Sequence, residues 1–366
     1  MLKAGIVGLP NVGKSTLFNA LTRSHKAPAE NYPFCTIEPN LGVVSVPDPR
    51  LDRLAEVVGV AQRIPAAIEF LDIAGLVAGA SRGEGLGNKF LSHIRETDAI
   101  LHCVRCYEDA DVHHVAGSID PVRDIATVAT ELVLADLESL RRQRDRIERD
   151  AKRGDKTAVH GIGLMDRLLP HLDAGKPANT LELPPEDRAV VRGFFLLTDK
   201  PTLFAANIKE DDLAAGGNAF TRQVADHARA HHACATVVIC AQLESDLADL
   251  SAAEGAAYLH ELGVEESGVS GLIKATHDLL GLRTFFTFNE TEARAWPIPG
   301  GTHAAQAAGT IHTDFERGFI KAERVFWEHL VEAGSVSHAR EAGHYAHEGR
   351  DYEVQDGDVL LFRFNV

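Results

Sequence analysis

The apolar positions in the first third of the chain follow two different periods. Short apolar runs of the strand type occupy residues 4–7, 42–46, 67–72 and 99–104. Between them the apolar residues recur at helical spacing, as in the stretch 15–21. Strands that alternate with helices predict a mostly parallel sheet, so the fold class we expect is α/β.

The pattern changes from residue 125 onward. Leu132, Leu137 and Leu140 lead into a run over 141–156 that is rich in Arg and Lys, with Asp and Glu interspersed. A turn at Gly154 and a second helix over 162–172 complete a helical hairpin. We therefore predict a coiled-coil insertion over 129–199 within an α/β domain formed by 1–128 and 200–280.

A third region begins after Gly281. The sheet pattern first resumes over 201–207 and 235–240, and a helix over 272–280 closes it. Beyond it, β-type runs at 285–288, 310–313, 351–354 and 359–364 surround one helix, at about 322–333. Residues 281–366 are therefore predicted to form a separate α+β domain.

Bulk composition excludes several classes of protein. The 366 residues are 45% hydrophobic and 25% charged, with a net charge of −16, so non-specific DNA binding is unfavourable, although one basic face remains possible. No run of 18 apolar residues occurs and a strand pattern starts at once, so we expect neither a membrane span nor a secretion signal. Five cysteines form no disulfide framework, which favours a cytoplasmic protein, and Cys103 and Cys106 are interpreted as strand-end thiols rather than metal ligands.

The most specific motif follows the first strand. Gly8-Leu-Pro-Asn-Val-Gly13-Lys14-Ser15, followed by Thr16, fits the phosphate-binding pattern G-x-x-x-x-G-K-[ST]. The glycines let backbone N–H groups converge on an anion at a helix N-terminus, and Lys14 adds a positive charge for the β- and γ-phosphates. The Ser15 hydroxyl is a ligand for Mg²⁺. The sequence therefore predicts a nucleoside triphosphate site.

A second motif supports a nucleotide-dependent switch. Asp72-Ile-Ala-Gly75 follows an apolar strand and fits D-x-x-G, in which Asp72 holds Mg²⁺ through water and the Gly75 N–H meets the γ-phosphate. A Gly-rich segment over 79–87 follows, of the kind that orders on triphosphate; a plain glycine loop is the alternative. Thr36 lies between the two motifs, where a second protein ligand to Mg²⁺ is expected.

The residue after the second motif indicates slow hydrolysis. Leu76 occupies the position at which Ras-like switches have a glutamine that orients water, and leucine forms no hydrogen bond. His114 is a candidate to position or activate the water in its place. The chain has 18 histidines, so a merely solvated His114 is the alternative.

The base-reading motif departs from guanine specificity. In N-K-x-D the aspartate accepts hydrogen bonds from guanine N1–H and N2–H₂, whereas this chain has Asn207-Ile208-Lys209-Glu210. The extra methylene of Glu210 moves the carboxylate by about 1.5 Å, so the guanine clamp is compromised. Asn207 could pair with adenine instead, which predicts ATP over GTP.

These motifs together resemble the YchF/Obg-like ATPase family, which belongs to the Obg-related translation-factor GTPases. The resemblance covers nearly the whole chain, and the run 72–95 is its most specific part. It implies a G domain with a coiled-coil insertion and a C-terminal TGS domain of the β-grasp type. It also implies ATP hydrolysis and association with the ribosome, with the large subunit and ribosomal RNA as expected partners.

The resemblance also implies roles for individual residues. Lys14 would be catalytic, and His114 matches the family's proposed catalytic histidine; Ser15 and Thr36 would bind Mg²⁺, and Asn11 resembles the asparagine of switches that use K⁺. The full set of expected nucleotide contacts is Asn11, Val12, Gly13, Lys14, Ser15, Thr16, Asp72, Gly75, Asn207 and Ile208.

The leading hypothesis is a slow ATP-hydrolysing switch that acts on the translation machinery. Three alternatives remain open: a GTP-preferring translation factor, a P-loop kinase for a small acceptor, and a scaffold that holds nucleotide as a structural ligand. The basic hairpin is the candidate ribosome contact, with Arg141, Arg142 and Arg144 as its first candidates. A solvated helix face is the alternative, because acidic residues interleave.

Overall fold

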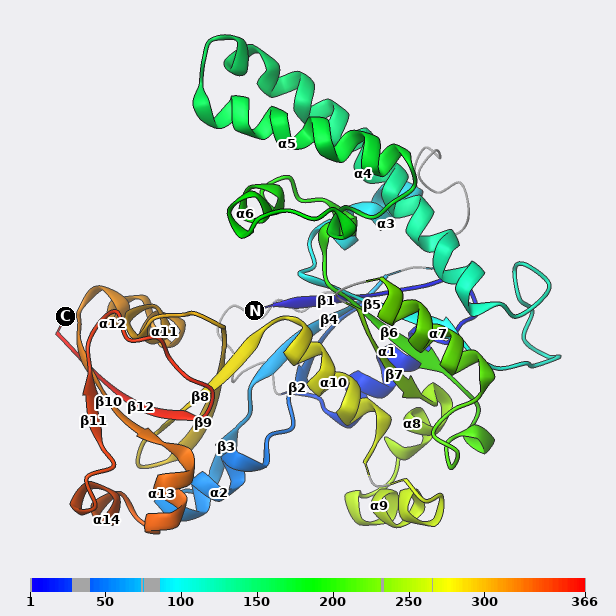
Figure 1. Cartoon of the computed structure of the whole chain (residues 1–366). Coiled ribbons are helices and arrows are strands. Elements are labelled where there is room, and N and C mark those ends of the chain that lie inside the picture. The colour runs from blue at the N-terminus through cyan, green and yellow to red at the C-terminus, as the bar shows by residue number, and fades with distance from the viewer. Residues whose placement is uncertain are drawn as a thin grey trace. The chain divides into compact units, whose positions relative to one another are not determined.

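The chain forms two compact units (Figure 1). The computed structural model describes residues 2–27, 40–73, 75, 86–231, 234–264 and 266–365. Within these, the first unit contains 2–26, 40–42 and 69–279, and the second contains 27, 43–68 and 280–365. The hairpin thus groups with the first unit and residues 43–68 with the second; the three-domain boundaries given above remain a prediction.

A six-stranded sheet lies mostly in the first unit, with most of β2 and the first two residues of β4 assigned to the second. Its spatial order is β2-β4-β1-β5-β6-β7. The strands are β1 (Lys3–Val7), β2 (Leu41–Ser45), β4 (Ala67–Asp72), β5 (Ala99–Arg105), β6 (Thr202–Asn207) and β7 (Cys234–Ile239). Strand β1 pairs in parallel with β4 and β5, and β6 pairs in parallel with β5 and β7. The predicted α/β class with a mostly parallel sheet is confirmed, and the carboxyl ends of β1, β5 and β6 lie at one edge.

The first unit also contains helices. They include α1 (Lys14–Ser24), α3 (Leu86–Arg95), α4 (Pro121–Lys152), α7 (Ala219–Ala230), α8 (Ala241–Leu247), α9 (Ala252–Glu261) and α10 (Gly268–Leu279). Of these, α1, α4, α7 and α10 pack on the sheet. Helix α4 starts at Asp120, whose side chain accepts the Arg123 N–H, and Pro121 at the first position favours the same start. None of the helices in the described ranges is long and apolar enough to cross a bilayer.

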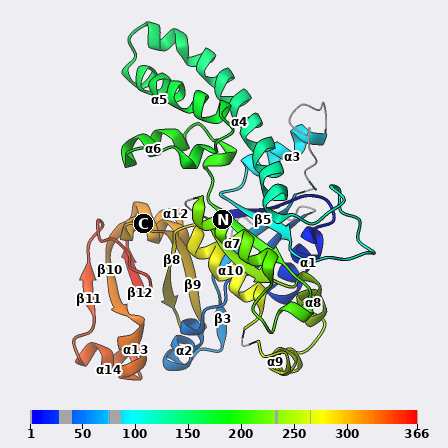
Figure 2. The ribbon, with the colours of Figure 1, turned by 45° about the vertical axis from the view of Figure 1, so that its right-hand side comes forward.

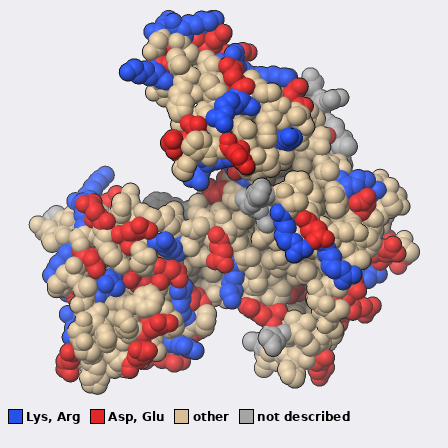
Figure 3. All heavy atoms as spheres, viewed as in Figure 1, with Lys and Arg blue, Asp and Glu red and all other residues tan. Residues whose placement is uncertain are grey.

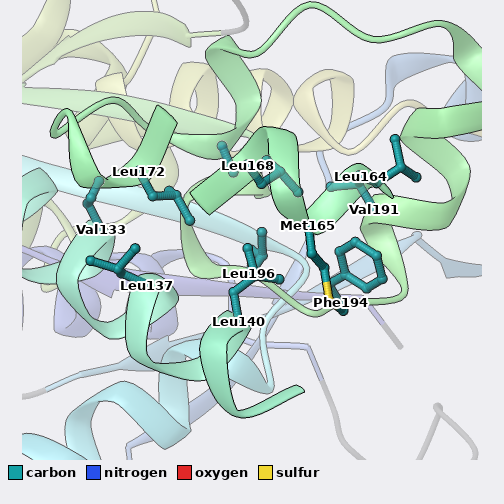
Figure 4. Packing of buried hydrophobic residues seen from close by; sticks show 11 residues of the cluster. Val133, Leu137, Leu140, Leu164, Met165, Leu168, Leu172, Val191, Phe194 and Leu196 are labelled. Atoms are coloured by element: carbon teal, nitrogen blue, oxygen red, sulfur yellow. The ribbon is translucent and has the colours of Figure 1, made fainter. Parts of the chain in front are cut away.

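The predicted hairpin is present. Helices α4 and α5 (Lys156–Asp173) lie side by side in both views (Figures 1 and 2). Figure 4 shows Val133, Leu137 and Leu140 of α4 facing Leu164 and Leu168 of α5 in one buried cluster. The return segment adds η3 (Ala178–Thr180), α6 (Pro185–Arg192) and η4 (Leu197–Asp199) to this packing. Burial of these apolar side chains stabilises the hairpin.

A buried carboxylate attaches the return segment to α4. Asp136 accepts hydrogen bonds from the Leu197 N–H at 2.7 Å, the Thr198 N–H at 2.8 Å and the Thr198 hydroxyl at 2.7 Å. Its side chain is fully buried. Burial raises the pKa of Asp136 to about 6, although the hydrogen bonds from Thr198 and Leu197 oppose that rise.

The second unit contains a mixed sheet in the order β11-β10-β12-β8-β9-β3. Its strands are β3 (Gln62–Ile64), β8 (Leu282–Phe288), β9 (Glu292–Pro299), β10 (Phe319–Phe326), β11 (Ala346–Glu348) and β12 (Asp358–Phe364); its helices are α2 (Pro49–Val58), α11 (Ala304–Ile311), α12 (Thr313–Arg317), α13 (Trp327–Ala333) and α14 (Val336–Glu341). The C-terminal strand β12 is parallel to β8, and the alanines of α11 pack on the sheet, as expected for a β-grasp arrangement.

Three local predictions in this unit are wrong. Residues 322–326 belong to strand β10 and not to a helix, because seven of its residues pair with β12 and this pairing overrides helix propensity. Residues 310–313 are the junction of α11 and α12, because buried alanines carry the helix through the β-branched Thr310 and Ile311. Residues 351–354 form no strand apart from one isolated bridge, between Glu353 and His303.

Candidate functional site

The phosphate-binding loop lies between β1 and α1, and its glycines are required by geometry. Gly8 has φ 153°, Asn11 φ 63° and Gly13 φ 96°. A Cβ at Gly8 would lie 2.5 Å from the Cys103 carbonyl oxygen, and one at Gly13 would collide with the side-chain nitrogen of Asn207. Only glycine allows the loop to approach both neighbours this closely.

Lys14 opens helix α1 and lies inside the loop. Its side chain is buried, and Nζ donates a 2.7 Å hydrogen bond to the Leu9 carbonyl. Burial lowers the pKa of Lys14, whereas the negative charge of Asp72 raises it in part. A partly desolvated ammonium inside the phosphate loop is suited to bind phosphate oxygens.

Ser15 and Asp72 meet beside this ammonium. The Ser15 hydroxyl donates to Asp72 Oδ2 at 2.9 Å. Burial raises the pKa of Asp72, and the Ser15 hydrogen bond and the Lys14 charge lower it in part. One hydroxyl and one carboxylate at the mouth of a phosphate loop fit the donor set of Mg²⁺, a cation that prefers oxygen ligands.

Gly75 also lies over the loop. A Cβ there would lie 3.1 Å from Lys14 Nζ and 3.2 Å from Pro10 Cα, so the chain passes directly above the phosphate loop. Thr36, Leu76, Cys35 and the segment 79–85 lie outside the described residues, and the hypotheses about them remain predictions.

Asn207 connects the base motif to the phosphate loop. Its Nδ2 donates to the Val12 carbonyl at 2.9 Å, and its Oδ1 accepts the Ala241 N–H at 3.0 Å. The side chain is buried. Asn207 is thus committed to holding three elements together, which leaves little of its amide for pairing with adenine; the predicted base contact stays untested.

A cavity of about 370 Å³ adjoins the loop on the side of β6 and β7. It is lined by Gly13, Thr16, Tyr107, Asp109, Val112, Asn207, Ile208, Lys209, Glu210, Asp211, Cys240, Ala241, Gln242 and Leu243. Lys209 Nζ lies 5.9 Å from the centre of the Tyr107 ring and 3.2 Å from an Asp109 carboxylate oxygen. An aromatic face and a paired lysine next to the phosphate loop are suited to a nucleobase.

The last residue of the base motif is engaged elsewhere. Glu210 lines the cavity, and its Oε1 accepts a 2.7 Å hydrogen bond from the Tyr258 hydroxyl of α9. Tyr258 itself is not among the lining residues.

Sequence reasoning missed Arg105, which supports the cavity wall. Its guanidinium is buried and donates to the carbonyls of Tyr107 at 3.1 Å, Asp109 at 3.2 Å and Val112 at 3.0 Å. The guanidinium also lies 4.7 Å from the centre of the Tyr107 ring. The available signal was a charged residue within an otherwise apolar strand, which predicts a specific set of partners.

His114 is held away from solvent. The Ala116 N–H donates to Nδ1 at 3.1 Å, so the ring proton lies on Nε2 and is donated to Asp124 Oδ2 at 2.8 Å. The other carboxylate oxygen of Asp124 accepts from Arg123. Both ring nitrogens are therefore occupied, although the preceding residue contacts the phosphate loop, because the His113 carbonyl accepts a 3.2 Å hydrogen bond from Asn11 Nδ2. The hypothesis that His114 is solvated is wrong; its catalytic role remains a prediction.

Known proteins match both units. A family described as "50S ribosome-binding GTPase" matches residues 3–137, and a C-terminal family, YchF-GTPase_C, described as "Protein of unknown function (DUF933)", matches residues 282–365. "Ribosome-binding ATPase YchF" of Bacillus subtilis is 50% identical over 366 residues, which is 100% of both chains. The protein of the same name from Escherichia coli O157:H7 is 49% identical over 364 residues, covering 100% of this chain and 99% of its own.

A solved structure agrees over the same length. The YchF GTPase of Schizosaccharomyces pombe has a TM-score of 0.88 and 33% identity, and the alignment covers 99% of this chain and 97% of that one. Similarity of sequence and of fold thus extends over both units. The chain belongs to the YchF family.

Proposed function

We propose that the protein is a ribosome-binding ATPase that hydrolyses ATP to ADP and phosphate and uses the cycle as a conformational switch. The main support is that the phosphate loop and the base cavity are continuous: Gly13 of the loop lines the cavity, and Asn207 of the cavity wall is hydrogen-bonded to Val12 of the loop. The Bacillus subtilis and Escherichia coli relatives carry the name ribosome-binding ATPase. The proposed compartment is the cytoplasm, where ribosomes work.

Each group of the site has a defined task in this proposal. Lys14 binds the β- and γ-phosphate oxygens, and the loop N–H groups complete the cradle. When bound, Mg²⁺ supplies charge neutralisation on the phosphates; Ser15 and Thr36 would hold it, and Asp72 would hold its water. Gly75 would meet the γ-phosphate.

Hydrolysis is proposed to be slow. Leu76 offers no hydrogen bond to water. His114 could position the water instead, but only after its ring gives up its hydrogen bonds with Asp124 and with the Ala116 N–H. Those hydrogen bonds must be exchanged for contacts with water. This exchange adds a conformational step before chemistry.

We expect kcat/KM for ATP to exceed that for GTP by about tenfold, because Glu210 is bound to Tyr258 and does not form the guanine clamp. Phosphate release from the two nucleotides in Mg²⁺ and K⁺ buffer measures the ratio. Equal or GTP-favoured kinetics would contradict the adenine preference and support the alternative GTPase. Release of phosphate without any phosphorylated acceptor would argue against the kinase alternative. Replacement of K⁺ by Na⁺ in the assay tests whether Asn11 helps to bind an activating K⁺.

The proposed ribosome contact is the outer part of the α4–α5 hairpin, with ribosomal RNA of the large subunit as partner. Figure 3 shows Lys and Arg atoms gathered on the hairpin, with Asp and Glu atoms among them. Arg141, Arg142 and Arg144 are each paired with an acidic side chain, at 3.2, 3.5 and 2.7 Å respectively. Paired arginines give weaker support for phosphate contact than free ones.

Two arginines nearer the tip are better placed. Arg146 and Arg149 are exposed, and within the described part of the chain neither forms an ion pair. Four arginines follow one another at spacings of four, three and four residues: Arg142, Arg146, Arg149 and Arg153. These spacings place them on one helix face. A helix face with this charge fits the phosphate backbone of RNA.

Reversal of the tip charges, Arg146→Glu with Arg149→Glu, is expected to weaken ribosome co-sedimentation by about tenfold at moderate salt. The matched control is Arg141→Glu with Arg144→Glu, which changes net charge equally but removes paired side chains; a smaller loss is expected. Sedimentation is compared with ATP, ADP and a non-hydrolysable analogue. Equal pelleting of wild type and tip variant at low and moderate salt would rule out this surface.

A further inference from the structure

The hydrogen bond between Glu210 and Tyr258 lies at the edge of the base cavity. Glu210 opens the short helix η5 (Glu210–Asp212) at the end of the base motif and lines the cavity. Tyr258 projects from α9, an element about fifty residues later in the chain, and donates to Oε1 at 2.7 Å. The hydrogen bond to Glu210 raises the pKa of the Tyr258 hydroxyl, so the proton stays on tyrosine.

Helix α9 is fixed in a position that maintains this contact. Its N-terminus carries a capping box, in which the Ser251 hydroxyl accepts the Glu254 N–H and the Glu254 carboxylate accepts the Ser251 N–H. Leu259, the neighbour of Tyr258, packs on the buried cluster that contains Ile208. Tyr258 is therefore held beside the base motif by packing that does not involve the nucleotide.

The chemistry of the two purines gives this contact a consequence. Guanine directs the N1–H and N2–H₂ donors at a carboxylate in the base motif, whereas adenine directs the lone pair of N1 to the same place. A free carboxylate thus attracts guanine and repels adenine. A carboxylate that accepts from Tyr258 has part of its acceptor capacity used and is drawn toward a residue outside the cavity lining.

The ion pair of Asp109 with Lys209 likewise reduces the negative charge offered to the base. Asp109 is another carboxylate of the cavity wall, and it pairs with Lys209 at 3.2 Å. The hydrogen bond from the Asp111 N–H and the interaction with Lys209 lower the pKa of Asp109. Its negative charge is therefore compensated within the wall. Of the acidic side chains in the cavity wall, Glu210 is the one at the position of the guanine-reading residue.

We propose that Tyr258 is a specificity-determining residue, which favours adenine over guanine by binding the Glu210 carboxylate and keeping it from the base. The inference rests on the adenine preference proposed above and names the residue that maintains it.

The test measures ADP and GDP binding by titration calorimetry on the full chain, so that chemistry does not contribute. In Tyr258→Phe, which removes only the hydroxyl, the ratio of the Kd for GDP to the Kd for ADP is expected to fall about fivefold, mainly through tighter GDP binding. Tyr345→Phe removes a tyrosine hydroxyl from the second unit and should leave the ratio unchanged.

A second background separates this role from a structural one. With Glu210→Gln already present, Tyr258→Phe should change the ratio by less than twofold, because no carboxylate remains to be released. A ratio that stays within twofold of wild type in Tyr258→Phe, or that changes equally in both backgrounds, overturns the inference. A wild-type protein that binds GDP better than ADP contradicts the adenine preference, whereas the change in the ratio still tests Tyr258.

Discussion

Lys14→Met is expected to weaken binding of ATP and ADP by about a hundredfold. The Lys14 ammonium is buried and already dehydrated, and Leu9 O is its hydrogen-bond partner in the loop. Exchange of that carbonyl for phosphate oxygens gives charge-assisted hydrogen bonds in a medium of low dielectric, worth about 3 kcal/mol. A hundredfold loss corresponds to about that free energy. Calorimetric titration with ADP measures it.

Methionine retains most of the buried apolar volume of the lysine stem, so the variant should fold. The Leu9 carbonyl loses its partner, which costs about 1 kcal/mol of stability and is visible in the melting temperature. Lys274→Met on α10 is the matched control, since this lysine is exposed and lies 3.8 Å from Glu266. ADP affinity of the Lys14 variant within threefold of wild type would contradict the assigned role.

Asp136→Asn is expected to destabilise the hairpin by about 2–4 kcal/mol, because an amide nitrogen replaces one of the oxygens that accept from Leu197 and Thr198. Each buried N–H left without an acceptor carries a desolvation cost. Urea unfolding measures the free energy, and hydrogen exchange at the Leu197 and Thr198 amides reports the local loss. Asp145→Asn, on the exposed face of the same helix, should change stability by less than about 0.5 kcal/mol.

The pH dependence of this effect has a definite sign. Burial raises the pKa of Asp136 to about 6 from its ordinary value of 3.8, so the folded state holds a proton that the unfolded state has released between these two values. The contribution of Asp136 to wild-type stability therefore decreases as pH rises from about 4 to about 6, by up to about 3 kcal/mol.

The Asn variant lacks this titration. The stability difference between wild type and Asp136→Asn should thus be larger at pH 4 than at pH 7. A difference that is independent of pH, or that grows toward neutral pH, would show that the carboxylate is not destabilised by its burial. Each comparison uses the same buffer ionic strength, so that surface charges cancel.

Several features of this fold could be predicted from local pattern. Strands β1, β4 and β5 appeared as short, mostly apolar runs, and the motif at Gly8–Ser15 determined where the first of them ends. The hairpin followed from leucines at helical spacing that have a matching set in the second helix. Such patterns are local, and the physics that produces them acts within about twenty residues.

The failures involve partners far apart in the chain. Strand β10 contains helix-forming residues, and its pairing with β12, about forty residues later, decides its conformation. Residues 62–64 form a strand because residues 292–294 lie beside them. A propensity calculated along the chain contains no information about such neighbours.

In the functional site, too, some features follow from the local sequence and others depend on distant partners. Lys14, Ser15 and Asp72 were identified by spacing, and the structure places them together. The burial of His114 depends on Asp124, and that of Arg105 on three carbonyls of the next loop, neither of which has a sequence signature. The contact between Glu210 and Tyr258 joins elements separated by about fifty residues and could be found only from the fold.

The double attachment of Asn207 has a mutational consequence. Because its amide holds Val12 and Ala241, a substitution at 207 damages the phosphate loop whatever base is bound. The side chain of Glu210, three residues later, is hydrogen-bonded to Tyr258 instead. Substitutions at position 210 or at its partner on α9 are therefore expected to alter the preferred purine while the contacts of Asn207 with the phosphate loop stay intact.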